Sequence, residues 1–194
     1  MAASANYAWA NRQIITHITR KIFSDTFGIG ENDMPLIYDV AHNVAKFEEH
    51  DVDGVTKKVC VHRKGATRAF GAGRKEIVKE YRSYGQPVLI PGSMGTHSYL
   101  LSGTELAMQK TFGSTCHGAG RVKSRSSAKK SITGDEVSKQ LLERGIIVRA
   151  PNQAAIAEEA PSVYKPSDEV VNTVYDAGIS NIVAGLRPLG VIKG

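Results

Sequence analysis

Apolar positions recur three or four residues apart along residues 4–23, and this spacing predicts an amphipathic helix. The apolar residues on or beside its predicted inner face are Ala8, Trp9, Ile15, Ile18 and Ile22. Gly28 and Gly30 follow, and we expect them to end the helix because glycine is favoured just after a helix C-terminus. The first predicted element is therefore a helix with one apolar face.

Shorter apolar runs predict strands. The runs are residues 36–40, 44–47, 55–61, 88–90, 97–101 and 146–148. The first of them is expected to be a buried strand that delivers His42 and Asn43 at its exit. Asp53-Gly54 lies in the acidic stretch between the second and third runs, and this pair is typical of a tight hairpin turn.

Two further helices are predicted in the last third of the chain. Thr133 with Glu136 three residues later is the pattern of a capping box, which predicts a helix that stops near Gly145. Ser167 is expected to cap a last helix that ends near Gly178. Strands and helices are mixed without a regular βαβ rhythm, so we predict an α+β fold. No linker divides residues 1–194, which we expect to form a single region.

Composition places the chain among ordinary globular proteins. Of 194 residues, 41% are hydrophobic and 23% are charged. No apolar run approaches the roughly 20 residues that span a membrane, and we expect no membrane partner. Polar residues within the first helical pattern exclude a signal peptide. Cys60 and Cys116 lie in no metal-like spacing, so we expect reduced thiols and a cytoplasmic location.

The net charge of +6 is unevenly distributed. Residues 57–130 hold 15 basic and 3 acidic side chains, a local net charge of +12, while both flanks are mildly acidic. A middle third this basic indicates a polyanionic partner, either nucleic acid or a nucleotide. A solvated lysine-rich face is the alternative interpretation.

Residues 113–121 (Gly-Ser-Thr-Cys-His-Gly-Ala-Gly-Arg) set His117 in a small-residue loop, directly before five basic residues within residues 121–130. An imidazole near cationic groups is suited to chemistry on phosphate. A glycine turn with an incidental histidine is the alternative. We expect residues 113–125 to converge with residues 39–43, 62–68 and 91–98, since each segment follows or borders an apolar run.

Two of these loops carry further candidates. His42 is the best candidate for a metal ligand, although a lone histidine also occurs in purely structural positions. Lys64 or Arg68 could clamp a phosphate, or their loop is simply solvated. The P-loop and dinucleotide fingerprints are both absent from the sequence, as is the Lys-x-Asp-Gly motif of lysine-based nucleotidyltransferases.

Five segments together closely resemble the RtcB family of GTP-dependent RNA ligases. They are residues 5–12 (Ala-Asn-Tyr-Ala-Trp-Ala-Asn-Arg), 38–43 (Tyr-Asp-Val-Ala-His-Asn), 61–68 (Val-His-Arg-Lys-Gly-Ala-Thr-Arg), 91–96 (Pro-Gly-Ser-Met-Gly-Thr) and 117–121 (His-Gly-Ala-Gly-Arg). The resemblance runs from about residue 2 to Gly194 and is similar to the C-terminal two-fifths of an archaeal-type member. It implies the corresponding part of the RtcB-type fold, with glycine-rich active-site loops.

The resemblance implies a role for individual residues. His117 would attack the α-phosphate of GTP to form a guanylyl-histidine, and His42 would bind manganese. Guanylate would pass to an RNA 3′-phosphate, or to a 2′,3′-cyclic phosphate after its opening, before a 5′-hydroxyl displaces it. Lys64, Arg121 and Arg125 would meet RNA phosphates. The residues implied to bind the nucleotide are Asn43, Pro91, Gly92, Ser93, Met94, Ser98, Ala119, Gly120, Tyr164 and Lys193.

The resemblance also implies partners. These are RNA ends such as tRNA halves, an archease activator, and an N-terminal ligase half supplied in trans. That half would carry the cysteine, aspartate and further histidines of a two-manganese site, of which only His42 is expected here. We therefore expect the isolated chain to be inactive or weakly active. A non-catalytic nucleic-acid-binding fragment of a truncated ligase is the alternative function.

Overall fold

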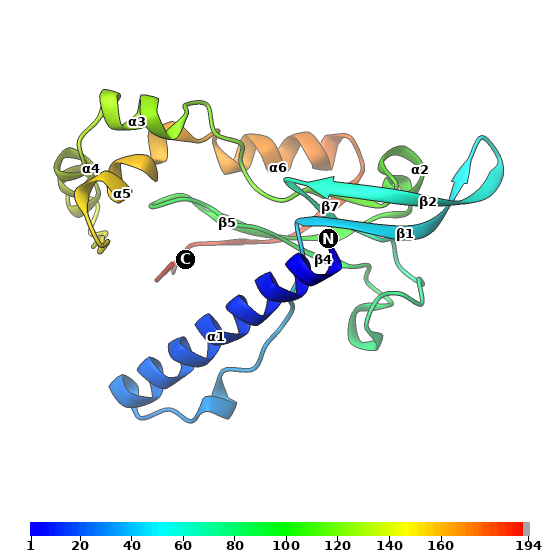
Figure 1. Cartoon of the computed structure of the whole chain (residues 1–194), viewed down its shortest axis with the longest axis horizontal. Helices are drawn as coiled ribbons and strands as arrows, with labels where there is room; N and C mark the ends of the chain where they lie inside the picture. Colours follow the sequence, from blue (N-terminus) through cyan, green and yellow to red (C-terminus); the bar gives the residue numbers. More distant parts are fainter. Residues whose placement is uncertain (192–194) are drawn as a thin grey trace.

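The computed structural model describes residues 1–191, which form helices and three small antiparallel sheets (Figure 1). This confirms the predicted α+β class. The strands are β1 (Asn43–Val52), β2 (Val55–Lys64), β3 (Ala66–Arg68), β4 (Pro87–Ile90), β5 (Ser98–Gly103), β6 (Ser114–Cys116) and β7 (Ser180–Leu186). They pair as β1-β2, β3-β6 and β4-β5-β7.

Six α-helices and three short 3₁₀ turns connect the described strands. The α-helices are α1 (Ala2–Phe27), α2 (Glu105–Thr111), α3 (Arg125–Ser131), α4 (Gly134–Leu142), α5 (Gln153–Glu158) and α6 (Ser167–Asp176). The 3₁₀ turns are Glu31–Asp33, Lys79–Tyr81 and Pro161–Val163. Figure 1 shows α6 running beside the three-stranded sheet, with α3, α4 and α5 gathered at one end of the molecule.

The β1–β2 hairpin follows the sequence prediction. Its strands pair from Asn43 opposite Lys64 to Val52 opposite Val55. Asp53 and Gly54 form the two-residue turn, with positive φ values of 57° and 77°. Positive φ at both positions belongs to the turn that matches the twist of antiparallel strands, and Asp-Gly tolerates it well.

Apolar side chains collect in three separate clusters rather than one core. Sheet β4-β5-β7 packs against α6 through residues such as Ile90, Leu101 and Val171. A second cluster joins α3, α4 and α5 through residues such as Val137 and Leu141. A third, smaller cluster comprises Phe70, Ile77 and Met108.

The capping box of α4 is confirmed, and it explains an error nearby. The Thr133 hydroxyl accepts from the Glu136 amide, while the Glu136 carboxylate accepts from the Thr133 amide at 2.8 Å. At the other end, Gly145 takes a left-handed φ of 73°, and the Ile146 amide donates to the Leu141 carbonyl. Residues 146–148 were predicted as a strand, which is wrong because Ile146 closes the helix end and packs against its cluster.

The predicted buried strand at residues 36–40 is also wrong. This segment pairs with no strand within residues 1–191, and Leu36 and Ile37 are 61% and 73% exposed. Side chains bind its carbonyl groups instead: the Tyr81 hydroxyl donates to the Ile37 carbonyl, and the Arg12 guanidinium donates to the Val40 carbonyl. The apolar run leads to His42 as an irregular segment.

Two helix predictions need correction in detail. Ser167 is the first residue of α6 and Pro166 precedes it as the cap, while the Ser167 hydroxyl donates to the His97 carbonyl. Helix α1 is longer than predicted and buries no residue, with Ile18 and Ile22 about half exposed.

No helix within residues 1–191 combines the length and apolar character needed to cross a bilayer.

We predict that Gly113→Ala strongly destabilises the fold. Gly113 has a φ of 59°, and an added Cβ would overlap the Phe70 ring and approach the Met108 sulfur to 2.6 Å. The left-handed backbone alone costs about 1–3 kcal/mol for a residue other than glycine, and the overlap adds to that loss. Urea unfolding measures the change. Gly120→Ala is the control, because nothing lies within 4 Å of its added Cβ. Equal stability losses in the two variants would contradict this account.

Candidate active site

Three of the four segments predicted to converge meet around Gly65, which joins β2 to β3. The Gly65 amide donates to the His42 carbonyl at 3.1 Å, and the Gly65 carbonyl accepts from the His117 amide at 3.4 Å. One peptide corner therefore binds both histidine-bearing segments. His42 directly precedes β1 and His117 directly follows β6, so two different sheets place the two imidazoles.

The two imidazole rings stack face to face. Their centroids lie 3.7 Å apart, and the ring planes differ by 3°. Burial lowers the pKa of His42, and the positive charges of Arg12 and Lys64 lower it further. Burial also lowers the pKa of His117 to about 4, with added contributions from His42 and Arg12. Both rings are therefore neutral near pH 7, and a neutral imidazole keeps the lone pair that a nucleophile or a metal ligand needs.

Arg12 sits beside this pair although it belongs to α1. Its guanidinium pairs with the Asp39 carboxylate at 2.7 Å and donates to the Val40 carbonyl at 2.8 Å. These bonds tie the helix to the irregular segment that leads to His42. Arg12 carried no role in the sequence analysis, but one signal could have found it: it is the sole Lys, Arg, Asp or Glu among residues 1–19.

The loop between β4 and β5 is tightly turned and lies next to the His117 loop. The Gly92 amide donates to the Ser98 hydroxyl at 3.0 Å, and the Ser93 amide donates to the Thr96 hydroxyl. An added Cβ on Gly118 would lie 3.8 Å from the Pro91 ring. The structure thus brings the predicted nucleotide-binding loop against the loop of the predicted nucleophile. Met94 instead packs against the cluster of α3, α4 and α5.

Tyr164 and Arg121 form a second polar cluster at the other end of the same loop. The Arg121 guanidinium donates to the Tyr164 hydroxyl at 2.8 Å and lies over its ring, 4.9 Å from the centroid. The Tyr164 hydroxyl donates to the Glu159 carboxylate at 2.6 Å. Burial and then the Glu159 carboxylate raise the pKa of Tyr164. Sequence reasoning missed Glu159, and no pattern in its neighbourhood points to this contact.

Ala119 and Gly120 connect His117 to that cluster. The Gly120 carbonyl accepts from the Lys165 amide at 2.9 Å, next to Tyr164. The Ser93 hydroxyl donates to the Glu159 carbonyl at 3.3 Å, which ties the β4–β5 loop to the same place. A surface therefore runs from the stacked histidines past Pro91 and Gly118 to Tyr164.

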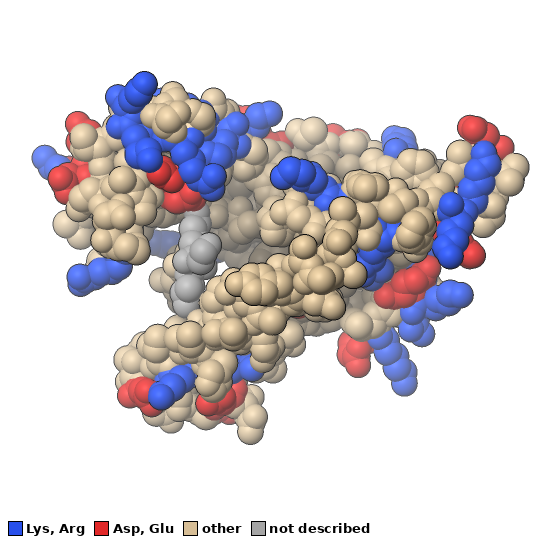
Figure 2. Space-filling model, in the orientation of Figure 1, with Lys and Arg blue, Asp and Glu red and all other residues tan. Residues whose placement is uncertain are grey.

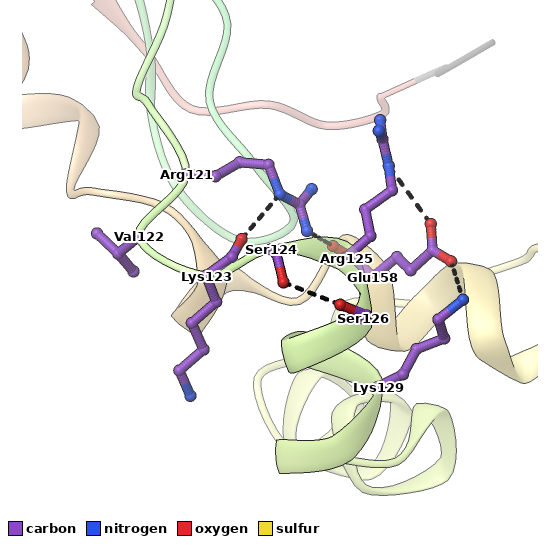
Figure 3. Close-up of a pocket in the computed structure, with 8 residues that line it drawn as sticks. All are labelled: Arg121, Val122, Lys123, Ser124, Arg125, Ser126, Lys129 and Glu158. Carbon is purple, nitrogen blue, oxygen red and sulfur yellow. Dashed lines mark hydrogen bonds and ion pairs between the residues drawn. The ribbon is translucent and has the colours of Figure 1, made fainter.

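A basic hollow lies beyond Arg121 (Figure 3). Its lining residues are Arg121, Val122, Lys123, Ser124, Arg125, Ser126, Lys129 and Glu158. The Glu158 carboxylate pairs with Lys129 at 2.7 Å and with Arg125 at 3.5 Å. The Arg125 side chain is nevertheless 70% exposed, whereas Arg121 directs its guanidinium toward Glu159 and Tyr164. Figure 2 shows lysine and arginine side chains gathered over α3.

Comparison with known proteins shows which family this chain is similar to. The sequence model of a family described as tRNA-splicing ligase RtcB matches residues 1–194. This chain belongs to the RtcB family. A tRNA-splicing ligase RtcB from Archaeoglobus fulgidus is 64% identical over 196 residues, which cover 100% of this chain and 41% of the relative. The relatives with the same name from Thermococcus kodakarensis and Nanoarchaeum equitans are 57% and 54% identical, again over 100% of this chain and 41% of each relative.

The RtcB resemblance implies a manganese site, which needs several ligand side chains close together. Within residues 1–191, no group of three or more His, Cys, Asp or Glu side chains is close enough to hold a metal ion. The stacked pair of His42 and His117 offers imidazole nitrogens without a carboxylate, whereas manganese favours oxygen ligands. These residues do not make a complete manganese site. Lys193, implied to recognise guanine in an RtcB protein, lies outside the described residues.

We predict that the free energy of unfolding falls as the pH is lowered from 6.5 toward 4. His117 protonates near a pKa of 4 in the folded chain but near its ordinary value of 6.5 when unfolded. Between these values the unfolded state binds more protons, so acid favours unfolding. The stability that depends on the neutral ring is fully present above pH 6.5 and is lost as the pH falls through about 4. Urea unfolding at pH 7, 6, 5 and 4.5 measures the decline.

The matched variants are His117→Gln and Leu142→Ala. His117→Gln removes the titrating ring and should give a shallower decline than the unsubstituted chain. Leu142 is exposed and has no ionisable group, so its replacement should leave the pH dependence unchanged. Identical slopes in the His117→Gln variant and the unsubstituted chain would contradict the assignment.

Proposed function

We propose that this chain carries the nucleophile and the nucleotide-binding loops of a GTP-dependent RNA ligase. The observation that carries the proposal is the neutral His117 ring, stacked on His42 and adjoining the loop of Pro91 and Ser93. The RtcB family, whose named relatives are tRNA-splicing ligases, supports the assignment. Because the chain spans about two-fifths of the length of these relatives, the complete reaction is proposed for this chain together with the remainder of such a protein.

The proposed reaction has three group transfers. A ring nitrogen of His117 attacks the α-phosphorus of GTP, forming a phosphorus–nitrogen bond as pyrophosphate leaves. An RNA 3′-phosphate oxygen then attacks the same phosphorus and breaks the phosphorus–nitrogen bond. This frees His117 and leaves GMP joined to the RNA 3′-phosphate. The RNA 5′-hydroxyl finally attacks the 3′-phosphate, and GMP departs. A 2′,3′-cyclic phosphate enters after water opens it to a 3′-phosphate. Histidine suits the first two transfers because its phosphoramidate is reactive enough to pass the group onward.

The nucleotide would lie along the surface from His117 to Tyr164. Backbone groups of Pro91 to Met94, Ser98 and the small residues Ala119 and Gly120 would surround its phosphates, with Asn43 beside them. Tyr164 presents an aromatic ring half-buried beside the Arg121 guanidinium, a geometry suited to flanking a guanine base. We propose Lys193 as a further contact to that base, as the RtcB resemblance implies.

We propose His42 as one nitrogen ligand of the manganese that the resemblance implies. Such an ion neutralises negative charge on a triphosphate. The remaining ligands would come from a polypeptide outside residues 1–191. Helix α1 supports such a contribution in trans because it exposes Trp9, Ile14 and Ile22 by 44%, 57% and 56%. Figure 2 shows this helix with few charged side chains on the face in view.

We predict a guanylyl adduct on His117, detected by intact mass after incubation with GTP and manganese chloride. The adduct is expected when this chain is mixed with the part of the Archaeoglobus relative that it does not match, because that part would complete the metal site. His117→Ala should abolish the adduct. His62→Ala is the matched control on the exposed face of the hairpin, and it should keep the adduct.

The outcomes of this experiment separate the candidate functions. An adduct on the chain alone would show that it assembles its own metal site, and would overturn the need for the added part. The absence of an adduct in both conditions, with RNA affinity retained, would favour the alternative of a non-catalytic nucleic-acid-binding fragment. The lack of three clustered ligands among residues 1–191 is the observation in favour of that alternative.

We predict that Lys64→Gln weakens RNA binding and flattens its salt dependence. Lys64 ends β2 opposite Asn43, and its charge acts on His42. Each lost phosphate contact on a single strand reduces the slope of log affinity against log salt by about 0.7. Fluorescence anisotropy with a 3′-phosphorylated RNA measures the slope. Lys57→Gln is the control because Lys57 lies at the other end of the same strand, opposite His50. Equal slopes for the two variants would contradict a phosphate contact at Lys64.

A further inference from the structure

A charged network is buried where the β1–β2 hairpin meets the turn before β6. The Arg63 and Glu48 side chains are only 1% and 9% exposed. The Arg63 guanidinium makes two parallel bonds to the Glu48 carboxylate, each 2.8 Å long. His50, also buried, places a ring nitrogen 3.1 Å from the same carboxylate. None of these residues entered the proposed reaction.

Arg63 continues from this ion pair to the neighbouring turn. Its Nε group donates to the Ser114 hydroxyl at 2.8 Å, and one terminal nitrogen donates to the Phe112 carbonyl at 2.9 Å. The planar guanidinium can serve a carboxylate and two further acceptors at once, which a lysine ammonium cannot do with the same geometry. The network therefore joins β1, β2 and the segment that begins β6.

Stability alone does not explain a buried ion pair. Well-packed apolar residues of similar volume are often equally stabilising, because burial strips water from both charges. Burial does push the pKa of Glu48 upward, yet hydrogen bonds from Arg63 and His50 and the Arg63 charge bring it below its ordinary value. Unlike apolar packing, the pair of Arg63 and Glu48 fixes the direction of the Arg63 hydrogen bonds to Ser114 and Phe112.

The turn that receives those bonds has an unfavourable backbone. Phe112 takes a left-handed φ of 50°, and Gly113 follows with a φ of 59°. A residue other than glycine adopts this conformation only where its surroundings impose it. The bond from Arg63 to the Phe112 carbonyl and the edge-on contact between the Phe112 and His50 rings, at 5.3 Å, act on that residue.

The same network lies on the path to both histidines of the site. Ser114 begins the three-residue strand β6, and His117 comes directly after it. Arg63 stands two positions before Gly65, whose amide and carbonyl bind the His42 and His117 segments. A shift of the hairpin against the Phe112–Ser114 turn would therefore move one imidazole relative to the other.

We propose that Arg63, oriented by Glu48 and His50, is a positioning residue that fixes His117 in its stack against His42. This inference deepens the proposed function, since His117 is the residue proposed to receive guanylate. The stack itself is measurable without any ligation reaction. The proposal predicts that loosening the Arg63 network separates the rings while the rest of the chain stays folded.

The test compares Arg63→Lys and Ser114→Ala by NMR of a chain with labelled histidine. Stacked imidazoles displace each other's ring-proton resonances through ring currents, and both variants should lose much of this displacement at His42 and His117. Arg63→Lys keeps a positive charge beside Glu48 but loses the guanidinium hydrogen bonds to the Ser114 hydroxyl and the Phe112 carbonyl. Ser114→Ala removes the acceptor of the Arg63 Nε bond and the weaker bond from the Ser114 hydroxyl to the Phe112 carbonyl at 3.4 Å, but it leaves the ion pair intact. It therefore keeps the test valid if Arg63→Lys does not fold.

The control is Val137→Ala in the helical cluster of α4, which lowers stability without touching the network. When its melting temperature falls as far as that of the network variants, Val137→Ala should still retain the ring-current displacement at His42 and His117. Unchanged displacement in the folded network variants would overturn the proposal, as would an equal loss in Val137→Ala. If the ring currents behave as expected here but the chain accepts no guanylate even when mixed with the unmatched part of the Archaeoglobus relative, the proposed function is overturned and this inference stands.

Discussion

The geometry of the site depends on one left-handed peptide corner. Gly65 takes a φ of 65° and turns the chain from the long hairpin into β3. That turn lets its amide and its carbonyl bind the backbones of His42 and His117, which are 75 positions apart in the chain. A side chain at this φ would strain the corner. The two rings can approach to stacking distance because their backbones share this one residue.

Charge then determines what the stacked rings can do. The middle third of the chain is strongly basic, and Arg12 and Lys64 act directly on the His42 ring. Burial and then the positive surroundings disfavour imidazolium, so the cations proposed to attract a triphosphate also favour the neutral form of the stacked rings. The proposed attraction of an anionic substrate and the proposed activation of His117 would therefore follow from one charge distribution. The acidic Glu158 and Glu159 lie toward the other end of the surface, where they orient Lys129 and Tyr164.

Local signals were sufficient for the parts of the fold that local chemistry decides. The Asp53-Gly54 turn and the Thr133–Glu136 capping box each satisfy their own backbone groups, and both are confirmed. The apolar runs at residues 36–40 and 146–148 were predicted wrongly because an apolar run does not reveal its partner. The first binds side chains instead of a strand, and the second closes a helix. Strand β7 was missed because its pairing with β5 is decided by tertiary contact.

The site divides in the same way. The convergence of the loops carrying His42, Lys64, Pro91 and His117 was predicted, because glycine-rich loops follow apolar runs there. The stacking of the rings could not be predicted from sequence, because it depends on the register of β3 with β6 and on the turn at Phe112. Arg63 shows the limit most clearly. In the sequence it is one more cation of a basic loop, whereas in the fold it is buried, paired and directed at the backbone leading to His117. From charge alone such a residue would be predicted to bind an anionic ligand. Only its burial in the fold indicates that it positions the backbone instead.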